Sequence, residues 1–154
     1  MIAQKTVPPS LYLAIKKNLT LPDVPVFADS VIPKLKQESE LLGLDVTGPL
    51  EFIYEGCDGS PDVPFDLTIG FPIQAMKSAS TAFVYITTHS FPCVFLEYKG
   101  SVYGIGAGWH EFFATVFKAD LILTGQCREV YQHWVDHDSA ENITELQIGI
   151  SDTL

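Results

Sequence analysis

Basic residues are scarce in this sequence. Its 154 residues include 9 Lys and Arg against 19 Asp and Glu, which gives a formal net charge of −10. Nucleic-acid binding draws most of its affinity from basic side chains that neutralise phosphates, and the densest basic run is only Lys16-Lys17. We therefore expect no direct binding of nucleic acid. The same acidic field attracts cations.

Cysteines are few as well. Cys57, Cys93 and Cys127 are odd in number and widely spaced, so neither a disulfide framework nor a zinc ribbon is predicted. Free, buried thiols in a reducing compartment fit this pattern. His133 and His137 lie among acidic residues, but no third fixed nitrogen or sulfur ligand accompanies them. We expect neither a metal nor a cofactor.

Long apolar runs are also missing. No uninterrupted stretch reaches the ~20 residues that a membrane span needs, and residues 1–10 lack the apolar centre of a signal peptide. We expect a cytoplasmic protein with no membrane contact. With 47% hydrophobic and 18% charged residues, the chain is too apolar to be disordered and has the size of one domain.

Apolar and turn residues alternate in an order that occurs twice. Each half reads strand, helix, strand, loop, strand. In the first half we expect a helix at 31–44, with a cap at Asp29 or Ser30, Pro33 in its first turn and a stop at Gly43. The second half carries its helix at 102–119. The predicted strands cover residues 10–17, 49–54 and 65–73, then 82–89, 93–98, 126–134 and 143–150.

The two halves align on each other. Tyr54 precedes Tyr131 by 77 residues, and the pair Ile69-Gly70 precedes Ile148-Gly149 by 79. A long unit that occurs only twice is a duplicated half rather than a solenoid repeat. We predict one α+β domain over 1–154, with half-repeats at about 10–75 and 80–150. Its fold would be a tandem βαββ repeat with pseudo-two-fold symmetry, an antiparallel sheet and two helices flanking a central ligand cleft.

Three glycines open the second helix, at Gly104, Gly106 and Gly108. A dinucleotide-binding turn would need a further glycine where Trp109 stands, and the indole would keep pyrophosphate away. Glycine costs a helix about 1 kcal/mol per residue. We infer that another group approaches this helix closely.

One segment places a carboxylate among aromatic residues. Period-2 alternation puts Glu129, Tyr131 and His133 on one face of their strand, and the repeat puts Phe52 and Tyr54 in the places of Glu129 and Tyr131. Such a site suits a lipophilic cation, through Coulomb attraction and cation–π contacts. The alternative is a Glu129 that faces water and tyrosines that belong to the core, and the residues alone leave both open.

These features together resemble the GyrI-like, or bacterial effector-binding, domains, which occur in some AraC-type and MerR-type regulators and as free-standing proteins. The resemblance runs from about residue 11 to 150. It rests on the order of three segments, namely FDLTIGFPI at 65–73, Tyr98-x-Gly100-x-x-Tyr103, and Glu129-x-Tyr131 followed by TELQI at 144–148. Gly149 departs from the proline that the family often has, and we expect no helix-turn-helix segment ahead of the domain.

The resemblance implies a small-molecule-binding domain for hydrophobic, cationic compounds, without DNA-binding activity of its own. The family's buried glutamate would fall on Glu129. The remaining ligand-binding residues would be aromatic, at Tyr131, Trp109, Tyr54, Phe52, Tyr98 and Phe112. Two alternatives stay open. One is a hydrolase of small lipophilic compounds that uses Glu129 as a general base. The other is a gyrase-modulator-like module that binds a protein partner or a second copy of itself.

Overall fold

The computed structural model describes residues 2–151, which divide into two compact units. Pro9–His89 form the central unit, and the described residues on either side of it form the terminal unit. Each unit has one α-helix and one four-stranded sheet in which every strand pair is antiparallel. The α+β class and the antiparallel pairing are therefore as predicted.

The central unit is continuous in sequence. Its strands, in sheet order, are β3 (Glu51–Glu55), β4 (Phe65–Pro72), β2 (Leu11–Leu19) and β5 (Val84–Thr87). A short 3-10 turn, η1 (Leu21–Asp23), leads into helix α1 (Val24–Leu41). Leu13, Leu35, Leu67 and Ile69 are fully buried and form the centre of its core.

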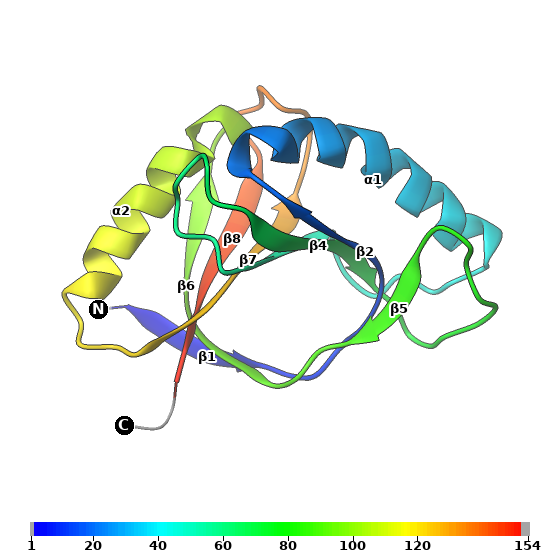
Figure 1. Cartoon of the computed structure of the whole chain (residues 1–154), viewed down its shortest axis with the longest axis horizontal. Coiled ribbons are helices and arrows are strands. Elements are labelled where there is room, and N and C mark those ends of the chain that lie inside the picture. The colour runs from blue at the N-terminus through cyan, green and yellow to red at the C-terminus, as the bar shows by residue number, and fades with distance from the viewer. Residues whose placement is uncertain (1, 152–154) are drawn as a thin grey trace. The chain divides into compact units, whose positions relative to one another are not determined.

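The terminal unit takes its strands from both ends of the chain. In sheet order these are β1 (Ala3–Val7), β6 (Phe91–Lys99), β8 (Ile143–Ile150) and β7 (Leu123–His133). The turn η2 (Val102–Gly104) leads into helix α2 (Ile105–Phe117), which lies along one face of this sheet (Figure 1). The helix and the sheet share a core of Val94, Phe112, Val116, Leu146, Ile148 and Ile150.

Strand pairing confirms an internal repeat of 79 residues. Ala14 pairs with Gly70 in the central unit, and Cys93 pairs with Gly149 in the terminal unit, so both partners shift by the same number. The outer strands obey the same offset but are exchanged between the units. Strand β1 precedes β2 in the chain yet pairs with β6, and β5 precedes β6 yet pairs with β2. Sequence reasoning did not predict β1.

The predicted match of Tyr54 with Tyr131 is wrong by two residues. Leu67 pairs with Tyr54, whereas its repeat partner Leu146 pairs with Glu129. Tyr54 is therefore the counterpart of Glu129, and Phe52 falls two residues short of it. The cause is a longer hairpin, because Tyr54 and Leu67 are 13 residues apart and Glu129 and Leu146 are 17 apart.

Helix α1 begins seven residues earlier than predicted. It starts at Val24 with Pro25 in its first turn, and Pro33 lies in its interior, on the exposed side. A proline inside a helix costs about 3 kcal/mol, and burial of one continuous face offsets this cost. That face comprises Val24, Ala28, Val31, Leu35 and Ser39. Gly43, with φ +67°, ends the helix as expected, because Leu44 and Gly43 donate to the carbonyls of Ser39 and Glu40.

Tyr98 is the group that approaches the glycine-rich start of α2. Its hydroxyl donates to the carbonyl of Ser101 at 2.8 Å. A Cβ at Gly104 would overlap the Tyr98 hydroxyl oxygen, and one at Gly108 would lie 3.0 Å from the ring, whereas Gly106 has open space. The inferred close approach is confirmed for two of the three glycines. Tyr98 thereby sets the distance between β6 and α2.

We expect Gly104→Ala to lower the free energy of unfolding by about 1–3 kcal/mol, the usual cost of overpacking. Gly106→Ala, the matched control on the same helix, should raise it by up to about 1 kcal/mol, because alanine favours helix and nothing is displaced. Urea unfolding measures both. In a Tyr98→Phe background the cost of Gly104→Ala should fall, and an unchanged cost would contradict the assigned overlap.

Candidate ligand-binding site

Strand β7 presents different residues to the two faces of the terminal unit's sheet. Glu129 and Tyr131 lie on the face that carries α2, since Glu129 contacts Trp109 of that helix. Gln132 contacts Glu145 on the opposite face. The predicted alternation therefore holds through Tyr131. A register shift between Tyr131 and His133 ends it, and His133 is exposed.

Two aromatic side chains hold the Glu129 carboxylate. The indole Nε1–H of Trp109 donates to Glu129 Oε2 at 2.7 Å, and the Tyr131 hydroxyl donates to Oε1 at 2.7 Å. Glu129 is 3% exposed. Hydrogen bonds to an ionised acceptor are short and strong, so this pair of donors defines the position of the carboxylate. The alternative in which Glu129 faces water is ruled out.

The Tyr131 hydroxyl is hard to ionise. Desolvation raises the pKa of Tyr131 well above its ordinary value of 10.0, and the negative charge of Glu129 and the hydrogen bond to it raise the pKa further. Each of these effects favours the neutral phenol, which is the form that can donate to the carboxylate. Tyr131 therefore remains a donor across the neutral and mildly alkaline range.

Two further aromatic residues adjoin this centre and were not predicted. The Phe113 ring lies 5.8 Å from the Trp109 ring, and the Trp134 ring stands edge-on to Tyr131 at 5.9 Å. A spacing of four residues on a helix signals the first contact. Trp134 follows the last residue of β7, so strand periodicity gave no indication of where its ring would lie.

The other predicted site residues lie elsewhere. Phe112 is buried in the core beneath Trp109, with ring centroids 6.2 Å apart. Tyr98 packs against the start of α2, as described above. Phe52 and Tyr54 belong to the central unit, where their rings are 6.4 Å apart and Tyr54 lies 5.6 Å from Phe65. Within the terminal unit, the structure thus joins Glu129, Tyr131 and Trp109 by hydrogen bonds.

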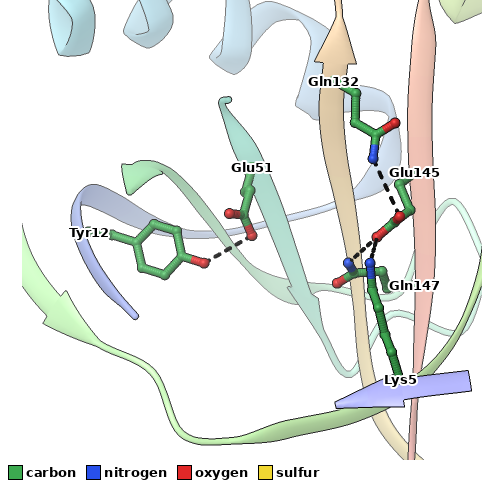
Figure 2. A network of polar contacts seen from close by, with 6 residues as sticks. All are labelled: Lys5, Tyr12, Glu51, Gln132, Glu145 and Gln147. Carbon is green, nitrogen blue, oxygen red and sulfur yellow. Dashed lines mark hydrogen bonds and ion pairs between the residues drawn. The ribbon is translucent and has the colours of Figure 1, made fainter. Parts of the chain in front are cut away.

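A second polar cluster lies on the opposite face of the terminal unit's sheet (Figure 2). Lys5 of β1 donates to Glu145 Oε2 at 2.6 Å, and the side-chain amides of Gln147 and Gln132 donate to the same carboxylate at 2.5 and 3.4 Å. Lys5 also lies 4.4 Å from the centre of the Phe95 ring. The central unit has a simpler contact in Figure 2, from the Tyr12 hydroxyl to Glu51 at 3.0 Å.

The cysteines differ in exposure. Cys93 is buried, as expected, and burial raises the pKa of its thiol to about 11, whereas Cys57 and Cys127 are only half-buried. Between residues 2 and 151 no group of three or more His, Cys, Asp or Glu side chains could hold a metal ion. Neither helix in that range is long and apolar enough to cross a membrane.

Solved structures supply the most informative comparison, since the sequence matches no family model and no curated protein. The C-terminal domain of EcmrR superposes with a TM-score of 0.80 at 18% identity, covering 98% of this chain and 97% of that one. The fold is that of the EcmrR C-terminal domain. EcmrR in complex with DNA also superposes at 0.80 and 19% identity, and the match covers 98% of this chain but 57% of that one.

Other chains share the EcmrR-type fold. SAV2435, solved with bound tetraphenylphosphonium, has a TM-score of 0.67 at 15% identity over 99% of this chain and 94% of that one. A hydrolase from Listeria innocua has a TM-score of 0.58 at 14% identity, over 97% and 91%. The predicted resemblance to effector-binding domains is confirmed for the fold.

The Tyr131 pKa can be measured directly. In an ultraviolet titration of the folded protein, we expect one of the six tyrosines to ionise well above pH 10, and this transition should vanish in Tyr131→Phe. In Glu129→Gln it should move down but stay above 10, because desolvation is the largest cause. Since the unfolded chain ionises first, this group makes stability fall as pH rises past 10. Six tyrosines that titrate together would contradict the assignment.

The Lys5–Glu145 pair should contribute to stability. Lys5→Met keeps most of the apolar stem but leaves Glu145 buried without its cation, so we expect a loss of about 1–3 kcal/mol in the free energy of unfolding. Lys99→Met is the matched control. Its pair with Glu141 spans 3.6 Å, with side chains 62% and 71% exposed, and its loss should stay below about 0.5 kcal/mol. Equal losses in urea unfolding would refute the distinction.

Proposed function

We propose that this chain binds hydrophobic cations, with Glu129 as the counter-charge and the Trp109 and Tyr131 rings beside it. The observation that carries the proposal is a carboxylate, 3% exposed, that two aromatic donors hold in place. Neither donor bears a charge, so these two hydrogen bonds orient the carboxylate without neutralising it. A charge in such surroundings acts more strongly on a nearby cation than it would in water.

The same rings supply affinity for the apolar part of a ligand. An indole or phenol face attracts a cation by about 0.5–2 kcal/mol and offers a large apolar contact area. The formal charge of −10 adds a long-range attraction for cations. The tetraphenylphosphonium bound to SAV2435, a chain of the same fold, supports this choice of ligand class. In this proposal the chain acts as an effector-binding domain.

A hydrolase remains the main rival, because the Listeria innocua neighbour is a hydrolase. A general base must reach the proton that it removes, directly or through one water. Both oxygens of Glu129 already accept hydrogen bonds from the protein, so a water would have to displace one of these donors. The geometry therefore favours binding over general-base catalysis. No observation singles out a protein partner or a second copy of the chain.

The proposal predicts a charge-selective loss of affinity. We expect tetraphenylphosphonium to bind with micromolar affinity, about −8 kcal/mol, and triphenylphosphine oxide, a neutral relative, to bind more weakly. Glu129→Gln keeps the side-chain volume but removes the charge. It should weaken the cation by about 1–3 kcal/mol and the neutral compound much less. Calorimetric titration measures both.

The control variant is Glu141→Gln. It changes the net charge by the same amount at a side chain that is 71% exposed, and we expect it to leave both affinities nearly unchanged. Equal losses for the cation and the neutral compound in Glu129→Gln would show that Glu129 is not the counter-charge. Similar losses in both variants would mean that only the overall charge matters.

A further inference from the structure

Two rows of aromatic rings in the terminal unit run outward from the Glu129 carboxylate. One row lies on helix α2, and the other begins on β7 and continues into the loop that joins β7 to β8; Figure 1 shows both segments. We name them the helix row, Trp109, Phe113 and Phe117, and the loop row, Tyr131, Trp134 and His137.

The helix row follows one side of α2. Its members are four residues apart, which places them one above another on the helix surface. The ring centres of Trp109 and Phe113 are 5.8 Å apart, as are those of Phe113 and Phe117. The inner ring donates to Glu129 Oε2, and the outer ring, Phe117, is 72% exposed. The row thus connects the carboxylate with the surface.

The loop row reaches the other oxygen of the same carboxylate. Tyr131 donates to Glu129 Oε1, Trp134 stands edge-on to Tyr131 at 5.9 Å, and His137 stands edge-on to Trp134 at 5.2 Å. Asn142, which is buried, accepts from the Val135 N–H and donates to the Asp136 carbonyl. These bonds hold the loop on both sides of the indole. Trp134 is nevertheless 43% exposed.

This arrangement has a chemical consequence. Ring faces carry partial negative charge and ring edges partial positive charge, so rings attract cations and pair with other rings face-to-edge or offset. An alkyl cation gains only the first attraction and apolar contact, whereas an aryl cation also gains ring pairs. A row of rings on each side of one carboxylate therefore distinguishes cations by the groups that surround the charge.

We propose that the two rows make this a site for cations that carry aryl groups, with Phe113 and Trp134 deciding the preference for aryl over alkyl cations. The inference rests on the proposed function, in which Glu129 supplies the counter-charge. A purely structural role for these rings is the rival explanation, because aromatic pairs four residues apart also stabilise a helix. The two explanations differ in what happens when the rings are removed.

The test compares two cations of equal charge. Tetraphenylphosphonium has four aryl groups and tetrabutylammonium has none. By calorimetric titration we expect the wild type to bind the aryl cation at least about tenfold more tightly. Phe113→Leu and Trp134→Leu should each weaken the aryl cation about five- to tenfold and the alkyl cation less than about twofold. Tyr103→Leu is the control, since Tyr103 is a 73% exposed aromatic residue outside both rows, and it should change neither affinity.

Phe117→Leu guards against a failure to fold, because its exposed ring contributes little to the core. It should weaken the aryl cation by a smaller factor and leave thermal unfolding nearly unchanged. Variants that lose affinity equally for both cations would show that the rings supply only apolar area, and unchanged affinities would show that the rows do not contact the ligand. Either result overturns this inference alone, provided that Glu129→Gln still weakens both cations. A wild type that binds neither cation overturns the proposed function too.

Discussion

The close packing of Tyr98 against the first turn of α2 is the constraint on which the candidate site depends. Glycine at 104 and 108 lets the helix approach the Tyr98 ring closely, and this contact sets the height of the helix above β6. Trp109 is the next residue after Gly108, so its indole reaches β7 from a position that the packing defines. Glu129 receives a hydrogen bond at 2.7 Å only because the backbone of α2 is held there.

A buried carboxylate is expensive unless polar groups surround it. The terminal unit contains two such groups, one on each face of its sheet, and treats them differently. Glu145 is matched by a lysine and two amides, an arrangement that balances charge and favours stability. The printed donors to Glu129 are an indole and a phenol, which satisfy hydrogen bonding and preserve the charge. The central unit has Tyr54 where the terminal unit has Glu129, so the duplicated scaffold carries this chemistry only once.

Sequence patterns sufficed for most of the fold. Alternation located β3, β4 and β8 to within two residues, and Gly43 marked the end of α1. The start of α1 was missed because Pro33 suggested a first turn, although the apolar spacing of Val24, Ala28 and Val31 already continued the buried face. Strand β1 was missed because it is a mostly exposed edge strand whose partner β6 lies more than 80 residues away, and no local pattern encodes such pairing.

The candidate site was predictable in part, for a similar reason. Period-2 alternation placed Glu129 and Tyr131 on one face, and helical spacing marked Trp109. The donor contacts depend on the distance between α2 and β7, which is a matter of packing. Trp134 lies beyond the end of its strand, where the loop held by Asn142 sets its position. Alignment by residue type equated the two tyrosines, although hairpin length decides which residues correspond.

The exchange of outer strands has a consequence for the order of events on the ribosome. The central unit is complete once β5 has been synthesised, because all its strands lie between residues 9 and 89. The terminal unit is completed by joining the first strand made, β1, to strands made last, and Lys5 meets Glu145 across 140 residues of chain. Until then the outer edge of β6 has unpaired backbone groups, which invite pairing with other chains. The first few residues of this protein therefore wait longest for their partners, and they close the edge that would otherwise be most prone to aggregation.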